Sequence, residues 1–263
     1  MLTYSRRMSP DRQRTVEHLP VQVHADGDAL ARAAAEAAAT VLRDTVAENG
    51  VAHAMFATGN SQLRFVDALV GSPGVPWSDV VVFHMDEYVG VGPDHRAGFQ
   101  HWIRERISRR VSPLRSHYID GLAEPQGECA RYAELLRNHP VDLCCLGIGE
   151  NGHLAFNDPP VADFADPLDV KVVELDPACR LQQVNEGHFS DVDAVPSHAI
   201  TITIPALLRA RAVLAVVPEE RKAVPVRDAL EGPVSTACPA SVLRTRDNVT
   251  LYLDAGSASL LGW

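Results

Sequence analysis

Continuous apolar runs separated by helical segments constrain the fold of this chain more than any other feature of its sequence. The runs cover residues 51–57, 80–83, 141–146 and 212–217, and polar residues rarely interrupt them. Strands that are covered on both faces have this composition, whereas strands with one solvated face alternate apolar and polar residues. The pattern therefore predicts an α/β fold whose mostly parallel sheet is covered by helices on both faces.

The order of the remaining elements agrees with this fold. An alanine-rich helix is expected over residues 26–48, because its apolar residues form one stripe and Asn49-Gly50 is a stop signal. Further helices are expected to end at residue 70 and to cover residues 99–110, 128–138 and 219–230, and further strands are expected at residues 21–24, 117–119, 170–174, 199–204 and 249–253. No linker or internal repeat interrupts this order. We therefore expect one domain over residues 21–263, preceded by an N-terminal extension of residues 1–20.

Composition and charge narrow the classes of function. The 263 residues are 46% hydrophobic and 22% charged, which is ordinary for a globular enzyme. The formal net charge of −10 argues against nucleic acid as a partner, because a phosphate backbone selects a basic surface. Residues 1–20 lack the apolar core of a signal peptide, and no apolar run is long enough to cross a membrane. We expect no membrane partner and a cytoplasmic location.

The five cysteines do not have the pattern of a disulfide framework or of a zinc site. Their number is odd, Cys144 and Cys145 are adjacent in an apolar run, and none has the spacing of zinc ligands. The sequence therefore predicts free thiols in a reducing compartment, and no metal site.

Three polar clusters follow strands, where parallel α/β sheets place their binding sites. The first is Thr58-Gly59-Asn60-Ser61, a turn between a strand and a helix. Its glycine lets a ligand approach the backbone, the hydroxyls are donors, and the amides at a helix start attract anions. This composition suits a phosphate, although the same composition is also common in a turn that only caps a helix.

The second cluster is Met85-Asp86-Glu87-Tyr88, directly after the apolar run of residues 80–83. Partial burial at the sheet edge would raise the pKa of Asp86, so that its carboxylate could act as a general base. The alternative is a structural carboxylate that caps a nearby turn.

The third cluster is the glycine-rich stretch of residues 146–160. Gly147, Gly149 and Gly152 let the chain turn sharply and let a ligand approach its backbone. His153 is expected at or near a helix start, where its imidazole can exchange a proton with a substrate near neutral pH. The alternative is a structural histidine, but the glycines on its N-terminal side favour a functional one.

A single lysine, Lys222, follows the apolar run of residues 212–217 near the beginning of a helix. It is either a phosphate-binding cation that adds to the turn at residues 58–61 or a solvated helix lysine.

Two motifs in these clusters resemble those of the glucosamine-6-phosphate deaminase (isomerase) family, in the superfamily that also holds 6-phosphogluconolactonase. They are Met85-Asp86-Glu87-Tyr88 and the stretch Gly-His-x-Ala-Phe-Asn at residues 152–157. The resemblance extends in order from about residue 20 to the C-terminus.

The resemblance implies a Rossmann-like three-layer α/β/α sandwich and a sugar-phosphate substrate, with no metal or organic cofactor. The implied reaction converts glucosamine 6-phosphate and water to fructose 6-phosphate and ammonia. Asp86 would move a proton from C2 to C1 of the opened sugar, and His153 would protonate the ring oxygen. The turn at residues 58–61 and Lys222 would hold the phosphate.

Some residues depart from the family pattern. Asn151 stands where an aspartate is usual, so it can orient His153 but supplies no charge, and Asp158 stands where the family has a longer glutamate. Arg180 is the candidate for a further phosphate-binding arginine. The arginine of the allosteric pattern is missing near Lys171, so we do not expect activation by an acetylated sugar phosphate.

Three other functions remain open at this stage. A related hexosamine phosphate, such as galactosamine 6-phosphate, could be the substrate. A lactonase of the same superfamily would use the histidine to activate water, and a non-catalytic sensor would bind a sugar phosphate without turnover. Because the positions of Asp86 and His153 are both filled, we expect an enzyme rather than a sensor. A homo-oligomer is compatible with the sequence, as is a monomer.

Overall fold

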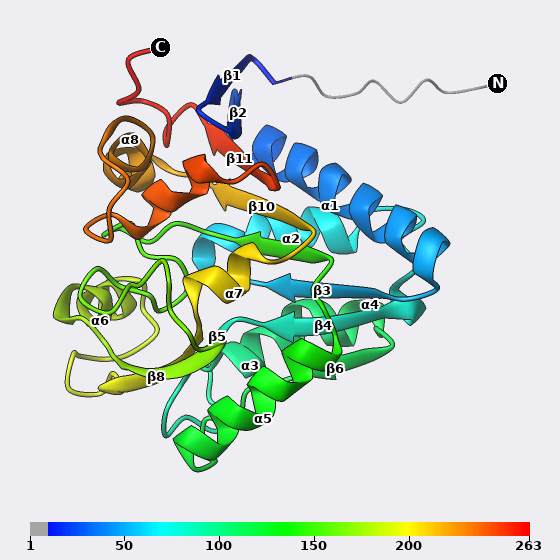
Figure 1. The fold of residues 1–263 in the computed structure, drawn as a ribbon, viewed down its shortest axis with the longest axis vertical. Helices are drawn as coiled ribbons and strands as arrows, with labels where there is room; N and C mark the ends of the chain where they lie inside the picture. Colours follow the sequence, from blue (N-terminus) through cyan, green and yellow to red (C-terminus); the bar gives the residue numbers. More distant parts are fainter. Residues whose placement is uncertain (1–9) are drawn as a thin grey trace.

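The computed structural model describes residues 10–263, and residues 1–9 of the expected N-terminal extension lie outside this range (Figure 1). Its main sheet has the strand order β1-β2-β11-β10-β7-β3-β4-β6. Every neighbouring pair in this sheet is parallel except β1–β2. The strands are β1 (Arg12–Val16), β2 (Leu19–His24), β3 (Ala52–Phe56), β4 (Val80–His84), β6 (Arg115–His117), β7 (Leu143–Leu146), β10 (Ala212–Val217) and β11 (Val249–Asp254).

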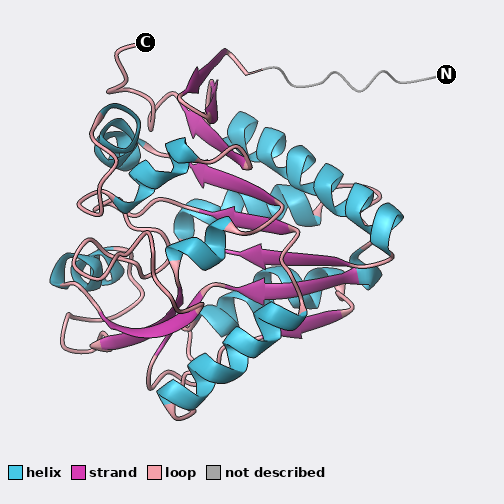
Figure 2. Ribbon diagram, viewed as in Figure 1, coloured by secondary structure: helices cyan, strands magenta, loops and turns pink. Residues whose placement is uncertain are grey.

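Helices cover both faces of this sheet, which makes the three-layer α/β/α sandwich that the sequence predicted (Figure 2). Successive residues of β3 show the two faces, because Ala54 and Phe56 belong to one buried cluster and Met55 belongs to the other. One face packs against α1 (Gly27–Asn49), α2 (Leu63–Val70) and the helical segment formed by α3 (Phe99–Ile103), the π-helical η3 (Arg104–Ser108) and α4 (Arg109–Val111). The other face packs against α5 (Pro125–Asn138), α7 (Ile204–Leu208) and α8 (Ala223–Glu231).

The longest helix, α1, has the termini that its sequence predicted. The side chain of Asp26 accepts a hydrogen bond from the amide of Ala29 at 2.7 Å, which caps the N-terminus. Gly50 ends the helix in the left-handed conformation, with φ at 79°. None of the described helices is both long and apolar enough to span a lipid bilayer.

A second, smaller sheet corrects part of the strand prediction. β5 (Asp86–Tyr88), β9 (His198–Ile202) and β8 (Val170–Glu174) pair antiparallel in that order. We expected β8 and β9 to belong to the parallel sheet, but the chain after the third cluster crosses back over the carboxyl ends of the main strands instead. α6 (Pro177–Asn185) lies beside this sheet, on the side toward which the arrowheads of β3, β4 and β10 point (Figure 1).

The N-terminal region also differs from the sequence expectation. Residues 12–16, which we assigned to an extension, form β1 and pair antiparallel with β2, so that Arg12 lies opposite Val23. The boundary at residue 20 lies within β2. β1 was not predicted because its residues are largely exposed and polar, as an edge strand allows. The short helices η1 (Asn60–Gln62), η2 (Trp77–Asp79), η4 (Glu220–Lys222) and η5 (Pro239–Thr245) complete the fold.

Candidate active site

One cavity receives side chains from the carboxyl ends of four strands of the main sheet. It is lined by the turn at residues 58–61 after β3, by Asp86 after β4, by His153 in the loop after β7 and by Lys222 after β10. The structure therefore brings together the three polar clusters and the lysine that were singled out in the sequence. The reason is topological, because the carboxyl ends of parallel neighbours meet at one edge of the sheet.

The cavity is small and is closed on one side by α6 and the residue that follows it. It encloses about 90 Å³, compared with about 300–1,000 Å³ for ordinary ligand pockets. Gln182 and Gln183 of α6 and Glu186 after it form part of its wall. A sugar-sized ligand therefore requires this wall to move outward.

The turn after β3 is shaped by Gly59 and held by Gln62. Gly59 has a φ of 97°, a conformation that side chains rarely adopt. The buried amide of Gln62 donates to the backbone oxygen of Val216 at 3.0 Å and so joins the turn to the end of β10. Because η1 starts at Asn60 and continues into α2, the backbone amides of this turn lie at a helix start.

Asp86 is a buried carboxyl group without a partner for one of its oxygens. Its Oδ1 accepts no hydrogen bond from the described residues. Burial, followed by the negative charge of Glu87, raises the pKa of Asp86 well above its usual range. The group therefore holds a proton more strongly than an ordinary aspartate and is a stronger base when it is ionised.

Glu87, which the sequence analysis did not select, fixes the helix beside the cavity. Its carboxylate accepts hydrogen bonds from the backbone amides of Tyr88 and Phe99 at 3.0 Å and of Gln100 at 2.6 Å. Burial raises the pKa of Glu87 to about 7, although these hydrogen bonds oppose the shift. Because Phe99 lines the cavity, Glu87 positions the first turn of α3 against it.

His153 lies in a tight turn rather than at the helix start that was predicted. Ala155 has a positive φ of 50°, and Leu154 bridges to Asn157. The amide of Asn157 donates to the backbone oxygens of Leu154 at 2.9 Å and of Ile202 at 2.8 Å, so the side chain of Asn157 ties the turn to β9. The prediction failed because the glycines before His153 are followed by a closed turn rather than by a helix.

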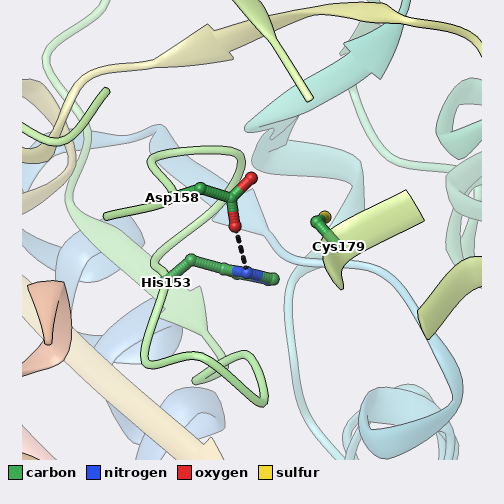
Figure 3. Close-up of side chains that lie close together, drawn as sticks. All are labelled: His153, Asp158 and Cys179. Carbon is green, nitrogen blue, oxygen red and sulfur yellow. Dashed lines mark ion pairs between the residues drawn. The ribbon is translucent and has the colours of Figure 1, made fainter. Parts of the chain in front are cut away.

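Asp158 and Asn151 hold the imidazole of His153, and Figure 3 shows the contact with Asp158. Nδ1 of His153 lies 2.8 Å from Oδ1 of Asp158. The amide of Asn151 donates to the same carboxylate oxygen at 2.8 Å, and its own oxygen accepts from the backbone amide of His153 at 3.1 Å. Asn151 therefore orients both partners without adding a charge.

The ionisation of Asp158 is opposite to that of Asp86. Burial alone would raise the pKa of Asp158, but the hydrogen bond and the charge of His153, together with the hydrogen bond from Asn151, outweigh burial and lower the pKa. Asp158 is therefore ionised across the neutral range and keeps the proton of His153 on Nδ1.

Two glycines give the histidine loop its shape. A Cβ on Gly149 would lie 2.3 Å from the ring of His153, so only glycine leaves room for the imidazole. Gly152 has a φ of 83°, and a Cβ there would lie 2.8 Å from the sulfur of Cys238. Gly152 does not line the cavity, so it shapes the loop from behind.

Lys222 is buried at the wall of the cavity. Burial, followed by the neighbouring charge of Arg221, lowers the pKa of Lys222 to about 8. Arg221 does not line the cavity. It forms ion pairs with Glu186 at 2.6 Å, Glu219 at 2.6 Å and Glu150 at 3.0 Å. It therefore joins the end of the α6 wall to the loop after β10.

Arg180, like Gly152, is a predicted binding residue that the structure places apart from the cavity. Its guanidinium donates to the backbone oxygen of Val195 at 2.9 Å and to that of Val192. These bonds fasten α6 to the segment before β9, and Arg180 lines a separate hollow that Asp86 does not reach. Arg180 thus stabilises the loop before β9 and does not contribute to the cavity.

One group among the described residues has the ligand types and spacing of a metal site. The donor atoms of His153, Asp158 and Cys179 all lie within 4.8 Å of one another. The sequence spacing of these residues is irregular, so it gave no signal for this group.

Comparison with known proteins gives one consistent result. A family model described as glucosamine-6-phosphate isomerases/6-phosphogluconolactonase matches residues 25–173. A glucosamine-6-phosphate deaminase of Lactobacillus delbrueckii subsp. bulgaricus is 35% identical over 206 residues, which are 78% of this chain and 86% of the relative. One of Exiguobacterium sibiricum is 38% identical over 185 residues, which are 69% of this chain and 71% of the relative.

Solved structures show the same fold. A structure described as a monomeric glucosamine-6-phosphate deaminase of the NagB superfamily superposes with a TM-score of 0.82 at 29% identity and covers 91% of this chain and 99% of its own. A 6-phosphogluconolactonase from Shewanella baltica superposes with a TM-score of 0.76 at 21% identity and covers 92% and 100% of the two chains. Because the lactonase is only 21% identical to this chain, its similarity shows a shared fold and nothing about activity.

Proposed function

This chain belongs to the family of glucosamine-6-phosphate isomerases and 6-phosphogluconolactonases, and we propose that it is a glucosamine-6-phosphate deaminase. The reaction converts glucosamine 6-phosphate and water to fructose 6-phosphate and ammonia. The observation that carries the proposal is that Asp86, His153, Lys222 and the turn at residues 58–61 line one cavity. A base, an acid and an anion site are the groups that this reaction requires.

The phosphate would bind at the turn after β3. The hydroxyls of Thr58 and Ser61 and the amides of the helix start donate hydrogen bonds, and the ammonium of Lys222 supplies the positive charge. The ion pairs of Arg221 keep the end of the α6 wall over this subsite until substrate enters.

Ring opening would be the task of His153. The charge of Asp158 stabilises the protonated imidazole, so Nε2 can give its proton to the ring oxygen while the C1 hydroxyl loses one. The hydrogen bonds of Asn151 keep the ring in that orientation.

Asp86 would perform the isomerisation of the opened sugar. As a carboxylate it removes the proton from C2 and returns it to C1, which leaves an iminium group at C2. Water then adds to that carbon and ammonia leaves, so fructose 6-phosphate is formed. The raised pKa of Asp86 suits this role, because it makes the carboxylate a stronger base toward carbon-bound hydrogen.

The test is a direct assay of products. The purified protein is incubated with glucosamine 6-phosphate, and ammonia and fructose 6-phosphate are measured separately. We expect equal amounts of the two products. If the protein turns over galactosamine 6-phosphate faster than glucosamine 6-phosphate, the assigned substrate changes. If it releases acid from 6-phosphogluconolactone and produces no ammonia, the protein is a lactonase. Tight binding without any product would make the protein a sensor.

A matched pair of substitutions tests the phosphate subsite. Lys222→Met should raise KM for the sugar phosphate by about tenfold or more, since the loss of about 1.4 kcal/mol of binding corresponds to a factor of ten. Arg180→Gln also removes one positive charge but lies outside the cavity, so it should leave KM within about twofold. An equal increase in KM for both variants would contradict the assignment.

A further inference from the structure

The histidine–aspartate pair behind the cavity has a third neighbour that the proposed reaction does not use. Cys179, in the first turn of α6, faces His153 and Asp158, which come from the loop after β7 (Figure 3). Asp158 and Cys179 are 1% and 2% exposed, so the carboxylate and the thiol meet in a nearly dry environment. An imidazole nitrogen, a carboxylate oxygen and a sulfur within 4.8 Å are three of the donor types that bind zinc.

Unsatisfied polar atoms point to the same place. Oδ2 of Asp158 is buried and accepts no hydrogen bond from the described residues, and the thiol of Cys179 is free rather than part of a disulfide. The hydroxyl of Tyr88 is also buried without a partner among these residues. Tyr88 and Cys179 belong to the same buried cluster. Buried polar groups are normally paired, so this gathering indicates a ligand.

We propose that His153, Asp158 and Cys179 bind a divalent cation of the zinc class and that the bound ion inhibits the enzyme. A thiolate with an imidazole selects Zn²⁺ or Co²⁺ over Mg²⁺ and Ca²⁺, which prefer oxygen ligands. Donor atoms that share one Zn²⁺ lie about 3.5 Å apart, given bonds of about 2.0–2.3 Å. Nδ1 of His153 and Oδ1 of Asp158 lie 2.8 Å apart and the sulfur of Cys179 lies within 4.8 Å of both residues, so the pair must separate slightly and Cys179 must approach it for the ion to bind, with water as the fourth ligand.

The proton balance explains why the ion inhibits. Binding releases the thiol proton of Cys179, so that the sulfur ligates as a thiolate. The ion also takes the Nδ1 position of His153, and the proton of the neutral imidazole moves from Nδ1 to Nε2. The ring is then neutral, and its Nε2 proton is much less acidic than that of an imidazolium, so His153 no longer protonates the sugar oxygen. Asp158 is occupied as a ligand and no longer supports an imidazolium. This inhibitory part rests on the proposed function, whereas the binding of the ion does not.

The ion has a path to the site through the cavity. His153 lines the cavity, and so do Gln182 and Gln183 of the helix that carries Cys179. The outward movement of α6 that admits a sugar would also open the space between Cys179 and Asp158. Substrate and ion therefore compete for the same open state.

Cobalt spectroscopy tests the binding without reference to activity. The metal-free protein is titrated with Co²⁺, and we expect thiolate-to-cobalt absorption with the visible bands of a tetrahedral site at one equivalent. Cys179→Ser should abolish this absorption and weaken Zn²⁺ binding, measured by competition, by more than about tenfold, because even outer-shell partners contribute about 10–100-fold. Cys129→Ser, which removes a buried thiol elsewhere, should change neither measurement. Absorption that is absent from the wild type, or equal in Cys179→Ser, overturns the proposal.

Zinc inhibition provides the second arm. Zn²⁺ should inhibit wild-type turnover reversibly, with recovery on chelation, and Cys179→Ser should be inhibited at least about tenfold less sensitively. The Cys179→Ala variant gives the same comparison without a hydroxyl that could replace the sulfur. Inhibition that is as sensitive in either Cys179 variant as in the wild type contradicts the regulatory role. If the protein does not turn over glucosamine 6-phosphate at all, the proposed function fails while the cobalt titration still decides whether the ion binds.

Discussion

Two buried aspartates at the same cavity have opposite environments. Asp86, at the start of β5, has one oxygen without a partner and a pKa raised by burial and by the charge of Glu87. Asp158, in the loop after β7, is also buried, with 1% of its surface exposed against 7% for Asp86, but His153 and Asn151 contact it and lower its pKa. Burial is therefore not what distinguishes them; the hydrogen-bonding partners are.

The difference separates two tasks that one residue type can perform. A carboxylate that contacts an imidazole and accepts a hydrogen bond from an amide is a permanent charge that orients a neighbour, as Asp158 does for His153. A carboxylate without partners keeps free basicity and is available to a substrate proton. The same chain thus builds a positioning group and, in the proposed reaction, a general base by changing only what surrounds the carboxyl.

The substitution Asp86→Asn should have the largest effect on turnover. We expect kcat to fall on the order of 10³-fold, since a positioned acid or base contributes about 10²–10⁴-fold. Stability should be unchanged or about 1 kcal/mol higher at pH 7, because an unpartnered buried carboxyl is removed. Steady-state kinetics and thermal unfolding check the two parts. A kcat within tenfold of the wild type would remove Asp86 from the role of base.

The substitution Asp158→Asn should have a smaller effect on turnover and the opposite effect on stability. We expect kcat to fall about 100-fold and the free energy of unfolding to fall by about 1–3 kcal/mol, because a buried charged partner of His153 is lost. The same two measurements apply. If this variant were as stable as Asp86→Asn, the contrast between the two environments would be wrong.

A third substitution displaces the histidine without touching either aspartate. In Gly149→Ala the new Cβ would collide with the ring of His153, so kcat should fall by about 10–100-fold. The control is Gly74→Ala, outside the cavity, where the added Cβ meets nothing within 4 Å and the cost is backbone strain of about 1 kcal/mol from the positive φ. Equal loss of kcat in the two variants would show that the effect at Gly149 does not come from displacement of His153.

The smallest effect is a difference in the pH dependence of stability. The pKa of Asp158 is lowered by folding, so its contribution is complete above the unfolded pKa and is lost as pH falls through the folded value. The pKa of Asp86 is raised, so its contribution is complete below the unfolded pKa and is lost as pH rises toward the folded value.

Urea unfolding at pH 3.5, 5 and 7 should therefore separate the variants. The free energy of unfolding of Asp158→Asn should be lower than that of the wild type at neutral pH, and this difference should shrink by about 1 kcal/mol toward low pH. The free energy of unfolding of Asp86→Asn should exceed that of the wild type by an amount that grows by about 1 kcal/mol toward neutral pH. Glu87, whose pKa is about 7, titrates above the two lower pH values in all three proteins. Parallel curves for the two variants would contradict the opposite ionisation of the two carboxyls.

Prediction from sequence succeeded where the signal was local and failed where it depended on contacts between distant segments. β3, β4, β7 and β10 were recognisable because a strand covered on both faces must be apolar throughout. α6 was not recognisable, because residues 177–185 have no clear apolar stripe, although they contribute Cys179 and the cavity wall. The small sheet was missed because a three-residue strand such as β5 carries no period that a sequence can show.

The sequence by itself determined the class of fold and the residues that gather at one edge of the sheet. This follows because parallel strands that alternate with helices must end on the same side, so Asp86, His153 and Lys222 were bound to approach one another. Only the tertiary structure decided what each group can do. Side chains far apart in the chain give Asp158 its partners and leave Oδ1 of Asp86 without one. They also place Cys179 beside His153 and Asp158, and they hold Arg180 outside the cavity. Ionisation depends on such neighbours and on solvent exclusion, and neither is encoded by local sequence.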